Sequence, residues 1–417
     1  MDRRKFLRSL VLSIPTLSLP FFNSLARMES NRVKITDVKC MLTNIGARVS
    51  PLVKVETDAG ISGIGECHHD SQGYGAKDII HNVFRPLLKG KDPFDLEQLV
   101  FQMSTNTSFY GGNHGIATHA VTGVEMALWD IIGKITNQPV RKILGGGPHV
   151  NEVRAYLSSR PDDMLSKESC AKYAEMVKNG GYTAVKVDML RDQHWLRSLK
   201  NRQLSNEEVD RNARGYQNIR DALGPDIDIA VHCHWELDFD SALRLAEAVA
   251  PVRPWWMEDP MPIAYNEQWT RLTEQSPVPI LCGENLYRRE DFRPFIVNAG
   301  VRKIEIDVAM AGGLLEAKKI ADLAETYFIP VATHNVAGPI ATVASANWAA
   351  SVREFLAHEI FPFGEDWSMN GDPEILGYDK PLIEDGYIQL SDRPGFGFDL
   401  NEDLLKEQML EGEEWWG

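Results

Sequence analysis

Several features that point to common classes of protein are scarce in this sequence. Its 417 residues include only five cysteines, which are scattered and have no C-x-x-C spacing. Such a set predicts neither a disulfide framework nor a thiolate zinc site. We expect the two cysteines that lie within predicted strands to be buried and inert.

Positive charge is also scarce. The chain has 44 Lys and Arg residues against 59 Asp and Glu residues, a net charge of -15. Residues 1–26 carry a net charge of +3, so the rest of the chain carries -18. A surface this acidic repels phosphate backbones and anionic lipids, and we expect no nucleic-acid partner. A small-molecule carboxylate substrate stays compatible with it, because a bound cation and a few lysines reverse the field within one cleft.

Long apolar runs are missing after residue 26, since no later stretch reaches the roughly 18 to 20 apolar residues that a membrane span needs. Before it, a basic start with Arg3 and Arg4, an apolar run over residues 10–22 and Ser24-Leu25-Ala26 have the three parts of an export signal. The paired arginines resemble a twin-arginine signal. We expect residues 1–26 to be a signal peptide and the mature protein to be periplasmic. The alternative is an ordinary basic, amphipathic start.

The chain after the signal begins with strand and helix patterns of a small domain. Residues 33–40, 52–56 and 61–66 have strand patterns, and helical patterns follow from about residue 76 to residue 146. We assign residues 27–148 to an N-terminal α+β domain.

A different pattern starts at residue 153, where short apolar strands alternate with amphipathic helices. Eight such units predict an α/β fold with a (β/α)8-type barrel over residues 149–385. We expect residues 386–417 to leave the barrel and return to the first domain. The strand candidates are residues 153–157, 184–187, 229–232, 255–258, 280–283, 304–306, 330–333 and 355–359.

Nearly every predicted barrel strand ends in an ionisable residue, and in this fold the C-terminal strand ends face the active site. So much charge in one barrel mouth would be unfavourable without a cation and a substrate. The residues are Lys186, Asp188, His232, His234, Glu258, Glu284, Asp307, His334 and Glu359.

Three of these residues have equal spacing. His232, Glu258 and Glu284 are separated by 26 and 26 residues, or one βα unit each. This places their side chains at equivalent heights on neighbouring strands and predicts a metal site with oxygen and nitrogen ligands. For Glu258 alone, a helix cap or surface salt bridge is the alternative.

The other strand ends suggest proton transfer and charge neutralisation. The two-residue strand period points both His232 and His234 inward, either as two metal ligands or as one ligand and one proton-transfer group. Asp307 and His334 end consecutive strands, so the carboxylate is placed to raise the basicity of the imidazole. Lys186 either neutralises a substrate carboxylate or forms a structural ion pair with Asp188.

At these motifs the chain resembles the mandelate racemase subgroup of the enolase superfamily, from about Lys34 to Leu405. The barrel motifs include the His334 strand and Asp307, which is followed by Ala311-Gly312-Gly313. The other matching segments are Gly123-Val124-Glu125-Met126-Ala127-Leu128-Trp129-Asp130, Glu258-Asp259-Pro260, Gly283-Glu284-Asn285 and Pro394-Gly395-Phe396-Gly397.

The resemblance implies a domain that caps the barrel and a divalent metal, usually Mg2+, that holds the substrate carboxylate. The enolase superfamily is itself a standard example of a Lys or His base that works with Mg2+. The resemblance implies that Glu258 and Glu284 are metal ligands, that Asp307 and His334 form the base dyad, and that Glu359 is an acid that polarises the carboxylate. It also implies a homo-oligomer.

Three positions set this chain apart within the subgroup. Lys186 matches the first lysine of the racemase Lys-x-Lys pair, but Asp188 replaces the second, which argues against racemisation. His232 stands where the family usually has Asp, so Mn2+, Fe2+ or Zn2+ compete with Mg2+. His234 matches the histidine that protonates the departing 3-hydroxyl in acid-sugar dehydratases such as galactonate and mannonate dehydratases.

We therefore expect a metal-dependent carbon–oxygen lyase that converts an aldonate into a 2-keto-3-deoxy acid. One alternative is a cycloisomerase that opens a 3,6-anhydrogalactonate ring. A second is a periplasmic sugar-acid binding protein without activity, suggested by His232 and Asp188. First-domain loops should supply the substrate contacts, for which the candidates are His68, His69, Tyr74, Tyr110 and Asn113.

Overall fold

The structure, a computed structural model, describes residues 33–45, 48–69, 73–108, 114–147, 151–190, 202–362, 373–378 and 381–416. The predicted signal peptide and two predicted substrate contacts, Tyr110 and Asn113, lie outside the described residues. Within these ranges, no helix is both long enough and apolar enough to cross a membrane.

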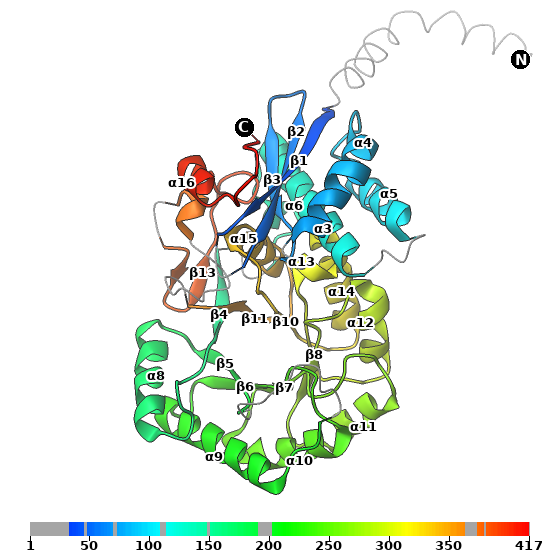
Figure 1. Cartoon of the computed structure of the whole chain (residues 1–417). Helices are drawn as coiled ribbons and strands as arrows, with labels where there is room; N and C mark the ends of the chain where they lie inside the picture. The colour runs from blue at the N-terminus through cyan, green and yellow to red at the C-terminus, as the bar shows by residue number, and fades with distance from the viewer. Residues whose placement is uncertain are drawn as a thin grey trace, which may run out of the picture.

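The N-terminal domain is a three-stranded antiparallel meander covered by helices (Figure 1). Helix α6 (Ile116–Thr136) packs closely against β3 (Ser62–Glu66). Gly63 and Gly65 allow this close approach, because a Cβ at either position would collide with a carbonyl oxygen of α6. The other elements are β1 (Ile35–Thr43), β2 (Ser50–Thr57), α3 (Tyr74–Ile79), the π-helical turn η2 (Ile80–Phe84), α4 (Arg85–Leu88), α5 (Leu96–Ser108) and α7 (Val140–Ile143).

The second domain is a closed barrel of eight parallel strands, because β11 pairs with β4, and each strand overlaps its predicted range. This confirms the predicted fold class. The strands are β4 (Glu152–Ser158), β5 (Ala184–Asp188), β6 (Asp228–His232), β7 (Trp256–Glu258), β8 (Ile280–Cys282), β9 (Lys303–Glu305), β10 (Val331–Thr333) and β11 (Phe355–Ile360).

Helices surround the barrel, and several begin at a side-chain cap. The Ser205 side chain and Glu208 form a reciprocal capping box at the start of α9, and the Asp238 carboxylate caps α10. The connecting elements are α8 (Lys167–Asn179), α9 (Asn206–Leu223), α10 (Phe239–Val249), η3 (Ala250–Val252), α11 (Glu267–Gln275), α12 (Arg288–Val297), α13 (Val308–Ala311), α14 (Leu314–Thr326) and α15 (Pro339–Ala349).

An apolar layer fills the interior of the barrel, so the barrel is not a pore. The side chains of Tyr156 and Trp256 are completely buried there. They pack with Leu281 and with small residues such as Ala184 and Ala230 from neighbouring strands. The charged strand-end residues follow this layer in the sequence, toward the C-terminal ends of the strands.

The C-terminal segment contacts both domains. The chain after β11 contains η4 (Pro373–Leu376), β12 (Ile383–Glu384), β13 (Tyr387–Gln389) and α16 (Glu402–Glu407), of which the last two lie within residues 386–417. We expected it to leave the barrel at residue 386, but β13 still pairs with β4 and extends the barrel sheet. Further on, Leu410 N–H donates to the Leu42 carbonyl at 3.0 Å, and the end of the chain lies beside the first-domain sheet (Figure 1).

Two buried carboxylates of the first domain bind the starts of barrel helices. Glu66 accepts hydrogen bonds from the N–H groups of Gly338 (2.7 Å) and Ala341 (2.9 Å) at the start of α15. Glu125 accepts from the first two N–H groups of α14, both at 2.9 Å, and from the Trp129 indole at 2.7 Å. Helix N-termini favour negative charge, so these contacts fix the first domain above the barrel.

A third buried carboxylate, Asp130, accepts a hydrogen bond from the Phe396 N–H of the C-terminal segment at 3.1 Å. Two glycines with positive φ make these contacts feasible. A Cβ at Gly313 (φ 96°) would collide with the Glu125 carboxylate, and a Cβ at Gly395 (φ 72°) would collide with Asp130. The Gly-Gly and Pro-Gly-Phe-Gly motifs therefore serve domain packing.

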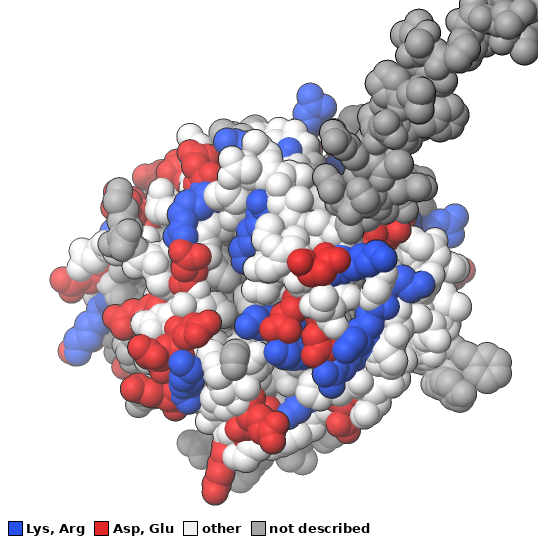
Figure 2. Space-filling model, turned by 90° about the horizontal axis from the view of Figure 1, so that it is seen from above, with Lys and Arg blue, Asp and Glu red and all other residues white. Residues whose placement is uncertain are grey.

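The surface that is at the top of the molecule in Figure 1 has a mixed charge. Figure 2 shows Lys and Arg side chains interspersed with Asp and Glu side chains on this face. Elsewhere in the described residues, ion pairs join Arg85 to Asp37 and Lys77 to Glu413, both at 2.6 Å.

Candidate active site

A cavity of about 710 Å³ lies at the C-terminal ends of the barrel strands. Seven of the nine predicted strand-end residues line it. The other two, Glu258 and Asp307, contact the lining residues Lys186 and His334. The barrel mouth therefore brings together the ionisable residues that the sequence predicted.

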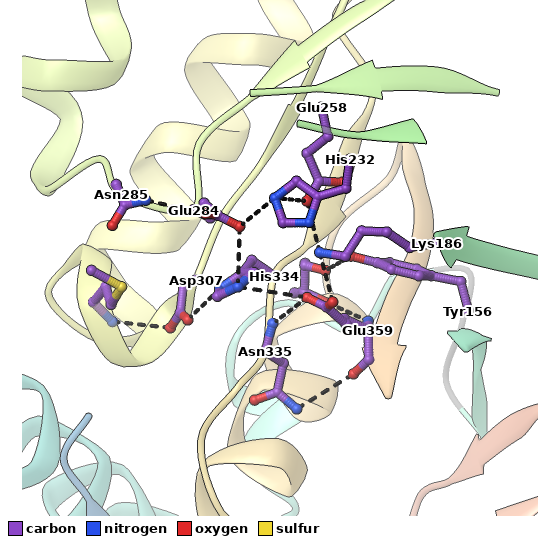
Figure 3. Close-up of polar contacts among 12 residues, drawn as sticks. Tyr156, Lys186, His232, Glu258, Glu284, Asn285, Asp307, His334, Asn335 and Glu359 are labelled. Atoms are coloured by element: carbon purple, nitrogen blue, oxygen red, sulfur yellow. Dashed lines mark hydrogen bonds and ion pairs between the residues drawn. The ribbon is translucent and has the colours of Figure 1, made fainter. Parts of the chain in front are cut away.

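The predicted metal ligands converge (Figure 3). His232 and Glu258 are paired across β6 and β7, and His232 Nε2 lies 3.5 Å from Glu258 Oε1 and 3.3 Å from Glu284 Oε2. His232 Nε2 is buried without a hydrogen-bond partner among the described residues. The three ligand atoms lie within 4.8 Å of one another, so the set fits one divalent cation.

The electrostatics of this cluster follow from burial and mutual contact. Burial lowers the pKa of His232, but the charges of Glu258 and Glu284 outweigh it and hold the pKa well above its ordinary value. Burial raises the pKa of Glu284, and His232 reverses this effect and lowers the pKa below its ordinary range. A bound cation would replace the proton that His232 otherwise carries between the two carboxylates.

Lys186 lies on β5 beside the metal-ligand cluster and is almost completely buried. Its Nζ is 2.7 Å from Glu258 Oε1 and 2.6 Å from Glu359 Oε1. Burial lowers the pKa of Lys186, but the two carboxylates outweigh it and keep the pKa well above its ordinary value. Lys186 is thus a permanent positive charge at the mouth.

Asp188 connects two histidines. Its Oδ1 lies 3.1 Å from His232 Nδ1 and 3.7 Å from His234 Nδ1, and the two imidazole rings stack with centroids 3.6 Å apart. Both rings line the cavity, as predicted, but the strand period does not explain His234. Strand β6 ends at His232, and a left-handed backbone (φ 53°) directs His234 into the cavity.

The Asp307 and His334 side chains form a hydrogen-bonded pair. Asp307 Oδ2 lies 2.7 Å from His334 Nδ1, while Asp307 Oδ1 accepts from the Met310 N–H at the start of α13. His334 Nε2 faces Glu284 at 3.4 Å and Glu359 at 3.9 Å. Burial lowers the pKa of His334, but Glu359, Asp307 and Glu284 together raise it to about 9. This imidazole is a strong proton acceptor.

Glu359 on β11 connects Lys186 to the backbone that follows β10. One oxygen pairs with Lys186, and the other accepts a hydrogen bond from the Asn335 N–H at 2.9 Å. Burial raises the pKa of Glu359, but Lys186 outweighs it and lowers the pKa below its ordinary value. The lowered pKa favours the carboxylate form, which pairs with Lys186. The role of Glu359 as an acid toward the substrate carboxylate stays a prediction.

The first domain contributes some of its predicted contacts to the cavity. His68 and His69 line it, with ring centroids 4.0 Å apart, and His69 contacts Arg48. His68 also packs against His119 of α6 at 4.9 Å. Tyr74, by contrast, is 53% exposed at the start of α3 and is not among the residues that line the cavity.

Sequence reasoning missed several further residues of the wall, and five of them illustrate why. Asn285 and Tyr287 directly follow the Gly-Glu motif of β8, so their position was a usable signal. Ser158 ends β4, the barrel strand without an ionisable end, and Arg160 follows it. Arg48 lies on the loop between β1 and β2, where no periodicity locates a side chain.

This architecture defines a class of barrel enzymes in which an α+β domain covers a buried cluster of carboxylates, imidazoles and one lysine. Comparison with known proteins specifies the class. Residues 26–145 match the mandelate racemase / muconate lactonizing enzyme N-terminal domain, and residues 168–404 match the enolase C-terminal domain-like family. The chain belongs to the mandelate racemase / muconate lactonizing enzyme family of the enolase superfamily, whose enzymes use a divalent metal.

Relatives cover nearly the whole chain. It is 34% identical to a D-xylonate dehydratase of Haloferax volcanii over 91% of this chain and 90% of that protein. It is 29% identical to a D-gluconate/D-galactonate dehydratase of Picrophilus torridus over 87% and 89%. A crystal structure of a mandelate racemase/muconate lactonizing enzyme-like protein from Rubrobacter xylanophilus superposes with a TM-score of 0.84, 31% identity and coverage of 93% and 100%. Dehydratases are carbon–oxygen lyases, so the predicted enzyme class is confirmed.

Proposed function

We propose that this protein dehydrates a sugar acid, removing the C2 proton and the C3 oxygen to give a 2-keto-3-deoxy acid. The observation that carries the proposal is the placement of two imidazoles across the mouth. His234 follows β6 and His334 follows β10, and these strands lie four positions apart in either direction around the barrel. A base and an acid on opposite walls suit an anti β-elimination. The acid-sugar names of the relatives support the same reaction.

His334 is the proposed base. Its Nε2 accepts the C2 proton, and the Asp307 carboxylate, bonded to Nδ1, stabilises the imidazolium that forms. Lys186, held by Glu359, supplies a positive charge beside the substrate carboxylate. The divalent cation, when bound by His232, Glu258 and Glu284, supplies further positive charge that holds this carboxylate and opposes the charge of the ene-diolate.

His234 is the proposed acid. As the C3–O bond breaks, His234 donates a proton to the departing oxygen, and the products are water and the enol of the 2-keto-3-deoxy acid. Because the base and the acid reach the substrate from opposite sides, we propose an anti elimination. A cycloisomerase would use the same residues, with a ring ether oxygen as the leaving group.

The metal and the location complete the proposal. Mg2+ is the expected metal, and Mn2+, Fe2+ and Zn2+ compete because His232 contributes nitrogen where a carboxylate would contribute oxygen.

Arg3 and Arg4 support export of the folded protein to the periplasm. Fractionation of cells that produce the full chain, and of cells that produce an R3K/R4K variant, tests the location.

A panel of five- and six-carbon aldonates, with Mg2+ or Mn2+, tests the reaction through formation of 2-keto acids. We expect His334→Asn to abolish both product formation and exchange of the C2 hydrogen in deuterated water. His234→Asn should retain the exchange while product formation falls about 10²-fold or more. Exclusive turnover of 3,6-anhydrogalactonate would establish the cycloisomerase. An intact substrate with no C2 exchange would contradict both reactions and indicate a binding protein.

A further inference from the structure

A second group of carboxylates lies beside the predicted metal ligands. Asp259, Glu284 and Glu305 each offer one oxygen atom, and these atoms lie within 4.8 Å of one another. Asp259 and Glu305 are completely buried, and Glu284 is 4% exposed. Glu284 also belongs to the cluster with His232 and Glu258, and it lines the cavity through which an ion would enter.

Two members of this group are buried without hydrogen bonds from the described residues. Neither oxygen of Asp259 and neither oxygen of Glu305 has a hydrogen-bond partner among the described residues. Buried polar groups are nearly always paired, and an unpaired buried carboxylate is strongly unfavourable. The described residues therefore leave these four oxygens to be satisfied by another group, such as a bound ion.

The backbone is adapted to bring the carboxylates together. Asp259 has a left-handed conformation (φ 43°), which is unfavourable for a residue with a side chain and tends to mark functional sites. Gly283 lets β8 approach β9, because a Cβ there would collide with the Glu305 carbonyl oxygen. Glu284 thus follows the closest approach of the two strands.

The local charge also exceeds what one divalent ion balances. Glu258, Asp259, Glu284 and Glu305 form one acidic group, and the nearby ammonium of Lys186 is shared with Glu359 outside it. With all four carboxyl groups ionised, one divalent ion would offset two of the four negative charges. A second ion would offset the rest, and dinuclear sites hold their ions roughly 3.5–4 Å apart, a separation that one bridging carboxylate spans.

We propose that Asp259, Glu284 and Glu305 form a second divalent-cation subsite, with Glu284 bridging it to the ion held by His232 and Glu258. Its ligands are oxygen atoms only, so it takes a hard cation such as Mg2+ or Mn2+, whereas the first subsite includes an imidazole nitrogen. The competing arrangement is a shared proton, because burial, together with the charges of Glu284 and Glu258, raises the pKa of Asp259.

Metal stoichiometry separates the two arrangements. The full chain is stripped with chelator, saturated with Mn2+, separated from free ion and analysed by elemental mass spectrometry. We expect two Mn2+ per chain in the wild type and one in Glu305→Gln, which keeps the shape of the side chain. Electron paramagnetic resonance should show a spin-coupled pair in the wild type and an isolated ion in the variant.

Glu66→Gln is the matched control, because it neutralises a buried glutamate at the domain interface and should still bind two ions. If Glu305→Gln does not fold, Asp259→Asn replaces it, with circular dichroism to verify folding. One Mn2+ per chain in the wild type at saturation would overturn the proposal and leave the shared proton. That result would not affect the proposed dehydration, which needs only the first subsite, whereas two ions without turnover would refute the dehydration alone.

Discussion

Buried carboxylates occur in two regions of this molecule, and the protein satisfies them in different ways. At the domain interface, Glu66 and Glu125 each accept hydrogen bonds from two backbone N–H groups at the start of a helix. In the barrel mouth, Glu284 faces two imidazoles, and Asp259 and Glu305 have no hydrogen-bond partner among the described residues. Burial is the same in both regions. Among these five carboxylates, hydrogen bonds from backbone N–H groups distinguish the two structural ones from the three that face the proposed metal subsites.

The same difference divides the motifs that relate this chain to its family. Glu125 and Asp130 belong to the first-domain motif, yet they bind a helix start and the C-terminal segment. Glu258 and Glu284 belong to the barrel motifs and face the cavity or its lining. A family motif therefore marks residues that serve either the fold or the chemistry. The contacts of each residue show which of the two it serves.

The largest effect should come from the mouth. Glu284→Gln removes a proposed metal ligand, and we expect kcat/KM to fall about 10³-fold or more, because the metal contributes several kcal/mol to charge stabilisation. Among the described residues no backbone N–H donates to Glu284, so the thermal midpoint of the metal-free protein should change little. Steady-state kinetics with excess Mn2+ and calorimetry test both statements. Full activity in this variant would remove Glu284 from the site.

Much of the barrel mouth could be predicted from the sequence, because strand period and spacing determine which side chains lie there. His232 and Glu258 are paired across neighbouring strands, as the equal spacing indicated. The same rule applied once more would have suggested Glu305, which ends β9 two residues before Asp307. The sequence did not predict that Asp259 belongs to this site, because its placement depends on a left-handed backbone conformation that no sequence pattern reveals.

The rest of the site depends on contacts between distant segments. His234 reaches the cavity through a backbone turn, and Arg48 reaches it from a loop of the other domain. Tyr74 was predicted to contact the substrate from a first-domain loop, but it lies at the start of α3 and is exposed. Local patterns cannot place such residues, since packing between domains decides where a loop lies.

At the interface, the effect should be on stability. Glu125→Ala leaves two N–H groups of α14 and the Trp129 indole without their acceptor, and we expect a loss of about 3 kcal/mol in the free energy of unfolding. Glu125→Gln retains one acceptor oxygen and should lose less. Urea unfolding measures both. Activity per folded molecule should stay at the wild-type level, and a loss comparable to that of Glu284→Gln would erase the distinction between the regions.

Asp188 offers a smaller change within the mouth. Its contact with His232 Nδ1 holds the ring with Nε2 toward Glu258 and Glu284, as carboxylates commonly do behind metal-binding histidines. We expect Asp188→Asn to weaken Mn2+ binding about 10- to 100-fold in calorimetric titrations. Asp162→Asn, which removes another carboxylate from the cavity wall, is the control and should bind as the wild type does. Equal weakening of Mn2+ binding in both variants would mean that any lost negative charge in the cavity has this effect, and that the contact with His232 is not its cause.

The smallest expected effect tests the part of the wall that the first domain supplies. His69 lines the cavity and contacts Arg48, so it is placed to bind a substrate hydroxyl, and the proposed mechanism gives it no proton transfer. Loss of one such hydrogen bond is worth about 0.5–1.5 kcal/mol, and His69→Ala should raise KM roughly 2- to 10-fold with little change in kcat. Tyr74→Ala, at an exposed position outside the cavity, should change neither constant. A fall in kcat for His69→Ala without a change in KM would instead place His69 among the groups that act on the transition state, and would extend the chemistry of the mouth into the first domain.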